Sequence, residues 1–271
     1  MPHHKVNDGT KIYYESKGSK GETILLLRGL ARSSQYWLGF DEKLARDYRV
    51  ITLDFRGTGK SEINISWPFS IGDLAEDCIE VLDKLSIGSC YIVGHSLGGM
   101  VAASMFAKRP ELVEGLMMVN SSIAGPVPRI NPMSLAQLLG ARGDANKFQS
   151  ILFDCLSIDT DSKSKVVPKW EALWKAEGVS ARLVLKQVAA AAAFRLPAIL
   201  RQSDLRPWVI CGRKDRFVPS LNSRYISRKI KAVHYRELDG GHELFLDCEN
   251  ELLEIISKEF VRAERESPSD C

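Results

Sequence analysis

The sequence has no long apolar run. A helix that crosses a bilayer needs roughly 20 consecutive apolar residues, and no stretch of the chain approaches that length. The N-terminus, Met-Pro-His-His-Lys, leads into polar residues and lacks the apolar core of a signal peptide. We therefore expect no membrane association and a cytoplasmic location.

Paired cysteines and a strong excess of one charge are also missing. The six cysteines are scattered, without the C-x-x-C spacing that is typical of zinc or redox sites. We expect reduced thiols that pack in the core, and no metal site. The net charge is only +3, whereas nucleic-acid binding usually needs a concentrated basic patch. The sequence thus predicts no nucleic-acid partner.

What is present is the composition of an ordinary globular protein, with 271 residues, 45% of them hydrophobic and 26% charged. Apolar runs bounded by turn residues, which are typical of strands, occupy residues 11–15, 23–27, 49–53, 90–93, 115–119, 207–211 and 233–238. Helical patterns separate most of these runs. The alternation predicts an α/β fold with a mostly parallel, doubly wound sheet that is covered by helices on both faces.

Helices are expected on this sheet from about Ser33 to Ala45, after Ser70, over residues 97–107 and from near Glu243. Ser70 precedes an apolar stripe with the 3.6-residue period, and Asp73 follows three residues later. This spacing is a variant of the capping box, in which the two side chains satisfy free backbone N–H groups.

The alternation of strand and helix breaks between residues 124 and 201, where no convincing strand is found. Helical patterns lie there near Leu135, near Phe148, and over residues 168–176 and 181–193. We interpret this stretch as an all-helical lid inserted after the strand at 115–119. The predicted organisation is an α/β core of residues 1–123 and 202–271, with a helical lid of residues 124–201.

A candidate nucleophile follows the strand at 90–93, in the sequence Gly94-His95-Ser96-Leu97-Gly98. This G-x-S-x-G pattern places a serine on a sharp turn from strand to helix, where flanking side chains would collide. The positive end of the following helix favours negative charge that develops there. Both the strand and the helix are predicted around the motif, so we interpret Ser96 as a nucleophile.

A serine hydroxyl needs a base to remove its proton, and the chain has five histidines. His242 is the best candidate, because it follows the last predicted strand in a Gly-rich loop at the edge of the sheet that carries Ser96. An acid must then orient the base. Asp215 follows the strand at 207–211, and the chain order Ser96, Asp215, His242 is the one expected for this fold.

Other carboxylates remain as alternatives to Asp215. An acid could follow the strand at 115–119, but position 120 is Asn. Asp204 and Asp239 are the fallback candidates for the orienting acid.

Two backbone N–H groups are expected to stabilise the oxyanion of the tetrahedral intermediate. One is that of Leu97, next to the nucleophile, and the other is that of Leu30, in the loop after the strand at 23–27. Gly29 would let the backbone of this loop approach the reacting atoms closely.

Together these residues resemble the α/β-hydrolase superfamily over nearly the whole chain, in its serine-nucleophile, lid-bearing branch of esterases and lactonases. Four motifs carry the resemblance in the order of the family: D-x-R-G-x-G-x-S at 54–61, G-H-S-L-G-G at 94–99, G-x-x-D-x-x-x-P at 212–219 and G-H at 241–242. The resemblance implies a hydrolase without metal or organic cofactor. It excludes the dehalogenases and epoxide hydrolases of the family, whose nucleophile is Asp.

One position departs from the family. The oxyanion loop of the family usually begins with His-Gly, and here it reads Arg28-Gly29. Arg28 either braces the loop or reaches a carboxylate of the substrate. Trp37 near this loop and Trp170 and Trp174 in the lid are further candidates for substrate contact, while lid packing is the alternative for the last two.

The expected lid carries more positive than negative charge. Residues 124–200 contain ten Lys or Arg and six Asp or Glu, a balance of +4. An acidic substrate is one interpretation of this balance, and a solvated helix face is the other.

The sequence therefore predicts a serine hydrolase that cleaves a small carboxylic ester, lactone or thioester through an acyl-enzyme on Ser96. Two alternatives stay open: a small-molecule receptor that keeps the triad but turns over slowly or not at all, and a carbon–carbon bond hydrolase. The expected partner is a small-molecule ester-type substrate, and the chain is expected to be a monomer or a homodimer.

Overall fold

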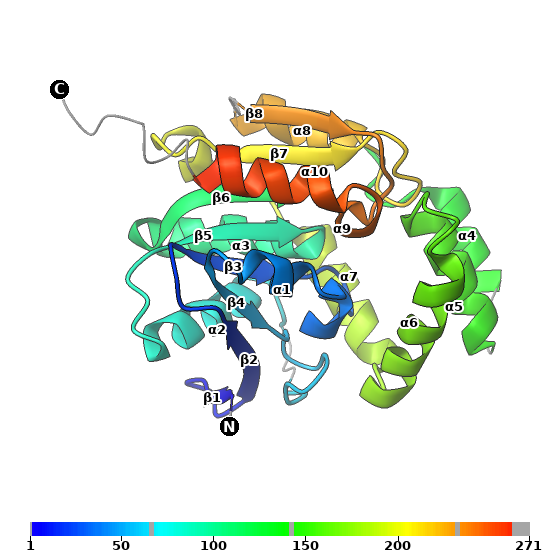
Figure 1. The fold of residues 1–271 in the computed structure, drawn as a ribbon, viewed down its shortest axis with the longest axis horizontal. Coiled ribbons are helices and arrows are strands. Elements are labelled where there is room, and N and C mark those ends of the chain that lie inside the picture. The colour runs from blue at the N-terminus through cyan, green and yellow to red at the C-terminus, as the bar shows by residue number, and fades with distance from the viewer. Residues whose placement is uncertain (1, 65–67, 141–143, 231–233, 262–271) are drawn as a thin grey trace.

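The computed structural model describes residues 2–64, 68–140, 144–230 and 234–261. Its centre is a sheet of eight strands in the order β1-β2-β4-β3-β5-β6-β7-β8 (Figure 1). The strands span β1 His3–Lys5, β2 Lys11–Lys17, β3 Thr23–Leu27, β4 Arg49–Leu53, β5 Cys90–His95, β6 Val113–Val119, β7 Trp208–Gly212 and β8 His234–Leu238. β2 pairs antiparallel with both β1 and β4, and parallel ladders join the neighbours in the order β4, β3, β5, β6, β7 and β8.

Helices cover both faces of this sheet, because its central strands are apolar on both sides. One apolar core lies between the sheet and α2 (Ile71–Lys84), α3 (Leu97–Lys108) and α8 (Leu221–Ile230). The opposite core includes α1 (Phe40–Leu44), α9 (Leu244–Asp247), α10 (Glu249–Glu254) and the π-helical turn Ile255–Phe260. The predicted doubly wound α/β fold is confirmed. Within the described ranges, no helix is long and apolar enough to cross a membrane.

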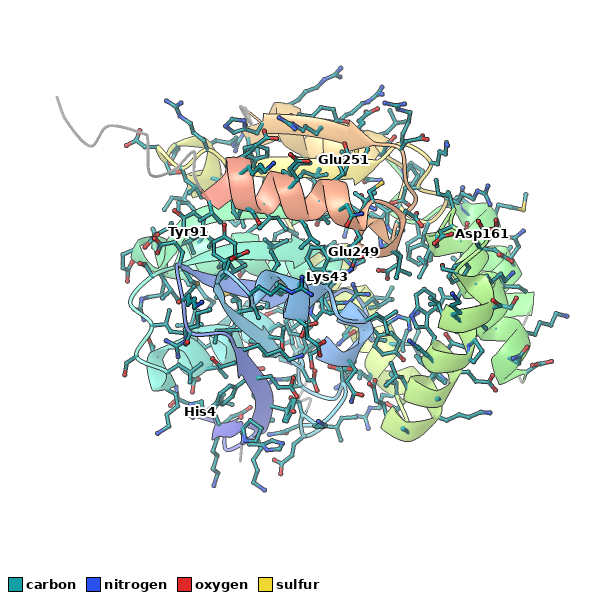
Figure 2. The ribbon with its side chains drawn as sticks, viewed as in Figure 1. His4, Lys43, Tyr91, Asp161, Glu249 and Glu251 are labelled. Atoms are coloured by element: carbon teal, nitrogen blue, oxygen red, sulfur yellow. The ribbon has the colours of Figure 1, made fainter. Side chains whose placement is uncertain are left out.

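Ion pairs tie the outer elements together at the surface. Lys43 of α1 donates to Glu249 at the start of α10 at 2.5 Å, and Figure 2 labels both side chains. Since both partners are partly exposed, this contact adds little to stability.

Four helices follow β6 without an intervening strand in the part of the interval that is described. They are α4 (Pro132–Gly140), α5 (Ala145–Leu156), α6 (Lys163–Glu177) and α7 (Ala181–Ala193), followed by the 3-10 turn Ala198–Arg201. α4, α5 and α6 lie beyond the arrowheads of the parallel strands (Figure 1). We call α4–α7 the helical segment; the division into residues 1–123, 124–201 and 202–271 stays a prediction.

Several elements differ from the sequence prediction. β1 was not predicted, because its residues His3–Lys5 carry no apolar alternation and gain their structure by pairing with β2. α8 was also missed, although Ile226 and Ile230 lie four residues apart and are both buried. The expected helix from Ser33 to Ala45 is a 3-10 turn, Ser34–Trp37, followed by the short α1, since Leu38 and Gly39 adopt positive φ.

Element boundaries also shift. α6 begins at Lys163 and not at Pro168, which lies inside the helix. The last predicted strand began at position 233, which lies outside the described residues, and β8 starts at His234. The capping box of Ser70 and Asp73 is confirmed: the Ser70 N–H donates to Asp73 Oδ2 at 2.7 Å.

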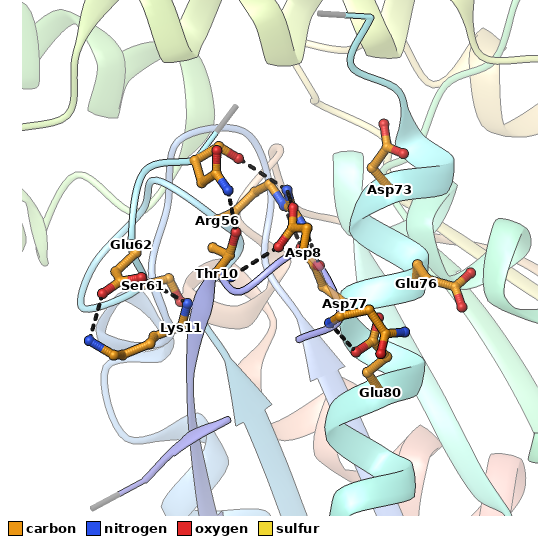
Figure 3. A network of polar contacts seen from close by, with 12 residues as sticks. Asp8, Thr10, Lys11, Arg56, Ser61, Glu62, Asp73, Glu76, Asp77 and Glu80 are labelled. Atoms are coloured by element: carbon orange, nitrogen blue, oxygen red, sulfur yellow. Dashed lines mark hydrogen bonds and ion pairs between the residues drawn. The ribbon is translucent and has the colours of Figure 1, made fainter. Parts of the chain in front are cut away.

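The loop at 54–61 supports the segment that follows β3. Arg56 anchors the loop, because its Nε donates to Asp77 of α2 at 2.7 Å and its Nη1 donates to Asp8 at 2.8 Å (Figure 3). The Asp54 carboxylate accepts the backbone N–H groups of Ser34 at 2.7 Å and Lys60 at 2.9 Å. The loop at 54–61 therefore helps to hold in place the segment after β3, which contains Leu30.

Candidate active site

Ser96 occupies a strained turn between β5 and α3, with φ 54° and ψ −115°. The two flanking glycines are required for steric reasons. A Cβ on Gly94 would lie 2.4 Å from the carbonyl oxygen of Gly98, and a Cβ on Gly98 would lie 2.3 Å from that of Leu27. The Ser96 N–H donates to the Val119 carbonyl at 2.8 Å. The expected strand–serine–helix turn is thus formed, and it holds Ser96 at the carboxyl edge of the sheet.

His242 and Asp215 are brought together by the loops after β8 and β7. The two side chains are 4% and 1% exposed, and His242 Nδ1 lies 2.7 Å from Asp215 Oδ2. The other carboxylate oxygen accepts the N–H groups of Phe217 at 2.8 Å and Val218 at 2.7 Å. Because a carboxylate accepts the Nδ1 proton, Nε2 is left as the basic nitrogen of the neutral ring.

Asn120 connects the acid loop to the base loop, a role that sequence analysis missed. Its Oδ1 accepts the Gly212 N–H at 2.8 Å, and its Nδ2 donates to the carbonyls of Gly241 at 2.9 Å and His242 at 2.7 Å. The side chain is 1% exposed. Its place directly after β6, at the edge where chemistry was expected, was the available signal. The sequence analysis considered position 120 only as a possible site for the acid and set it aside because it is Asn.

His95 supports the same loop from within the core. Its Nε2 donates to the His242 carbonyl at 2.9 Å. Burial lowers the pKa of His95 to about 3, so the ring stays neutral and acts as a fixed donor. Asn120 and His95 thus hold the base through its backbone carbonyl.

The loop after β3 passes directly over the nucleophile. A Cβ on Gly29 would lie 3.2 Å from the Ser96 Cβ, and Arg32 N–H donates to the Gly29 carbonyl at 3.4 Å, closing a turn around Leu30. Ala31, at φ 54°, donates its N–H to Gln187 Oε1 of α7 at 2.9 Å. Gln187 is fully buried. The helical segment therefore holds the turn that carries the expected Leu30 donor, and Leu97 lies at the first turn of α3.

Arg28 braces this loop and does not reach the pocket. Its Nη2 donates to both carboxylate oxygens of Glu243, at 2.8 and 3.1 Å, and its guanidinium lies 4.7 Å from the centre of the Trp37 ring. Burial alone would raise the pKa of Glu243, but the charge and hydrogen bond of Arg28, together with the neighbouring His95 and Arg32, outweigh it and the pKa falls to about 2. Since Glu243 already neutralises Arg28, the suggested contact of Arg28 with a substrate carboxylate is corrected to a structural role.

A cavity of about 260 Å³ connects Ser96 and His242 to the helical segment. Its walls are mostly apolar and include Leu30, Phe148, Trp174, Val184, Val188 and Phe217. Trp174 thus lies where substrate contact was predicted. Trp37 and Trp170 do not line this cavity: Trp37 packs on Phe40 and Phe245, and Trp170 packs on Tyr36 and Phe153. Their tentative assignment to substrate contact is corrected to core packing.

Comparison with known proteins agrees with this fold and motif order. A family model described as the alpha/beta hydrolase fold matches residues 22–248. The chain belongs to this family. At this general level it is a hydrolase, as predicted.

Individual relatives cover most of the chain. A putative carbamate hydrolase RutD of Stutzerimonas stutzeri is 28% identical over 239 residues, which cover 85% of this chain and 89% of the relative. The structure of esterase RhEst1 from Rhodococcus sp. has a TM-score of 0.82 at 24% identity and covers 97% of this chain and 99% of its own. Est816, an N-acyl homoserine lactone degrading enzyme, has a TM-score of 0.77 at 25% identity, with coverage of 94% and 98%.

Proposed function

We propose that this hydrolase is a serine esterase that cleaves a small carboxylic ester, lactone or thioester. His242 Nε2 removes the proton from Ser96 Oγ, which attacks the carbonyl carbon of the substrate. The N–H groups of Leu97 and Leu30 stabilise the oxyanion. Each such donor typically contributes ~2.7–4 kcal/mol to lowering the barrier. His242 then returns the proton to the leaving group, and water hydrolyses the acyl-enzyme.

The observation that carries this proposal is the buried pair of His242 and Asp215, 2.7 Å apart, which opens onto the same cavity as Ser96. An ionised carboxylate behind the ring stabilises the imidazolium that forms during proton transfer. A buried pair of this kind beside a strained serine serves general-base chemistry better than it serves packing. We assign Asp215 as the acid, because Asp239 is exposed and pairs with Lys214.

The names of the relatives agree with attack on an acyl carbonyl. Esterase, lactone degrading enzyme and carbamate hydrolase all describe cleavage of a bond next to a carbonyl carbon. The apolar walls of the cavity favour a substrate with an apolar body. In this proposal the helical segment is the lid that shapes the pocket.

Turnover of p-nitrophenyl butyrate by the wild type and by Ser96→Ala tests the proposal. We expect steady release of p-nitrophenolate by the wild type and a loss of at least 10³-fold in Ser96→Ala, since removal of a triad member leaves only oxyanion and binding effects. Equal rates in the two proteins contradict the assignment of Ser96. A single burst without steady turnover supports the receptor alternative instead.

A further inference from the structure

A second buried arginine, Arg32, lies in the wall of the cavity that contains Ser96. Arg32 follows Leu30 by two residues, and its backbone N–H closes the turn around Leu30. Its guanidinium carbon lies 4.1 Å from the centre of the Tyr36 ring and 4.3 Å from that of Trp170. The two rings fix the plane of the cation, because guanidinium groups stack on aromatic faces.

The charge of Arg32 has no close partner among the described residues. Its Nη1 and Nη2 are buried without a hydrogen bond, and no carboxylate lies within 4.0 Å of it. Two acids act on its charge from beyond that distance: Glu243, which binds Arg28, and Glu177, whose Oε1 accepts a hydrogen bond from Ser33 at 2.5 Å while its Oε2 makes none. A buried cation that lacks a partner is costly, and a compensating anion removes much of that cost.

Arg32 differs from Arg28 in its partner and in its position relative to the cavity. Both arginines are buried on the same loop, but only Arg28 has an internal carboxylate, and only Arg32 lines the cavity. A ligand in the cavity can approach Arg32, because Arg32 is one of the residues that line it. The remaining walls are almost wholly apolar, so a single cation there would decide the orientation of a ligand.

We propose that Arg32 binds a carboxylate of the substrate, so that the enzyme acts on esters or lactones that carry an anionic group. This inference rests on the proposed esterase function and narrows its substrate class. Both Nη atoms are covered in this structure, so we expect the side chain to rotate slightly toward the cavity as the anion enters. Charge-assisted hydrogen bonds to guanidinium are the strongest polar contacts available to such a ligand.

A matched pair of esters tests this subsite. p-Nitrophenyl butyrate and mono-p-nitrophenyl succinate have acyl chains of equal length, but only the second carries a carboxylate. The measured quantity is the ratio of kcat/KM for succinate over butyrate, because this ratio is independent of the fraction of active enzyme. A hydrogen bond to a charged group contributes ~1.5–3 kcal/mol, so we expect Arg32→Met to lower the ratio by about 10- to 150-fold. Arg32→Lys should restore part of it.

The control variant is Arg46→Met, which removes the same charge from an exposed position. It should leave the ratio unchanged, which separates a local contact from the general field of the protein. If Arg32→Met leaves the ratio unchanged while butyrate is still hydrolysed, the anion subsite is refuted and the esterase function stands.

If neither ester is hydrolysed, the esterase function is contradicted, but the anion subsite is not. A binding experiment tests the subsite in that case. Binding of 4-phenylbutyrate and of its neutral amide to Ser96→Ala can be followed by tryptophan fluorescence, since Trp170 and Trp174 lie beside the site. We expect the carboxylate to bind at least tenfold more tightly than the amide, and Arg32→Met to abolish this preference. Equal affinity for both ligands would overturn the inference.

Discussion

The two sides of the cavity are built on different principles. On the sheet side, polar groups hold one another: Asp215 fixes His242, and Asn120 and His95 fix the loop that carries it. On the side of the helical segment, the walls are mostly apolar side chains such as Trp174 and Val188. In our proposal, chemistry depends on the sheet edge, while the helices shape the apolar part of the pocket.

The largest expected effect comes from the sheet side, in Asp215→Asn. The amide keeps the shape of the side chain but favours the wrong tautomer of His242, and the equivalent change in serine proteases lowers kcat by about 10⁴-fold. The measurement is kcat for p-nitrophenyl butyrate at neutral pH. Asp239→Asn, on the exposed neighbouring loop, should retain near wild-type activity, and a similar loss there would reopen the choice of acid.

The ion pair of Arg28 and Glu243, which supports the oxyanion loop, should contribute to the free energy of unfolding. With a pKa near 2 instead of 4.5, Glu243 is stabilised as an anion in the folded protein. At about 1.4 kcal/mol per pKa unit, this corresponds to about 3 kcal/mol. Because the folded pKa is lowered, the wild type should be more stable than Glu243→Gln above about pH 5, and the advantage should vanish as the pH falls toward 2.

Urea unfolding at several pH values measures this difference. In an Arg28→Met background, Glu243→Gln should no longer be destabilising, because the partner of the carboxylate is gone. A pH-independent difference between wild type and Glu243→Gln would contradict the ion-pair account.

Replacement of Asn120 is predicted to lower both the free energy of unfolding and kcat. Asn120→Leu leaves the Gly212 N–H and the Gly241 carbonyl without their side-chain partner and leaves the His242 carbonyl with His95 alone, and each unsatisfied buried group costs about 1–3 kcal/mol. Part of this loss will be relieved by local relaxation, so we expect about 2–3 kcal/mol in unfolding free energy and a lower kcat. Asn120→Asp is the sharper variant: it keeps the acceptor for Gly212 but turns a second oxygen toward the Gly241 and His242 carbonyls, and should also lower kcat.

Gln187 of α7 is a polar link between the helical segment and the loop after β3. Gln187→Leu leaves the Ala31 N–H unsatisfied and loosens the turn around Leu30, so we expect kcat to fall about tenfold, for ~1.4 kcal/mol of barrier, with little change in KM. Gln187→Glu keeps the Oε1 acceptor and should recover much of the loss. Leu185→Gln, exposed on the same helix, is the control. Equal loss in KM and kcat would assign Gln187 to the pocket wall instead.

The smallest effects are expected on the apolar wall. Val188→Phe reduces the cavity from the α7 side, and such volume changes in hydrophobic pockets usually change specificity by about 1–3 kcal/mol. The ratio of kcat/KM for p-nitrophenyl octanoate over acetate should fall, while the rate for acetate changes little. If both substrates slow equally, the helical segment contributes to the chemistry and the proposed division between the two sides is wrong.

The same contrast explains what could be predicted from sequence. The turn at Ser96 and the mostly parallel sheet follow from local rules, because Gly94 and Gly98 leave no room for side chains and buried parallel strands are continuously apolar. Asp215 and His242 were found by their positions after predicted strands. These features depend on short stretches of chain.

Long-range pairings could not be predicted in this way. Arg28 meets Glu243, and Ala31 meets Gln187, across 215 and 156 residues of sequence. No local pattern distinguishes Arg28, which has a carboxylate, from Arg32, which has none. The apolar periodicity of α4–α7 predicts helices, but it does not separate Trp174, which faces the cavity, from Trp170, which packs against Tyr36.

Covalent labelling tests the central claim most directly. After incubation with a fluorophosphonate, peptide mass spectrometry should find one adduct, on Ser96, in the wild type. His242→Ala should lose this adduct, because the serine then has no base to activate it. An adduct on another residue, or equal labelling of Ser96 in His242→Ala, would contradict the account that Ser96 is a nucleophile activated by His242.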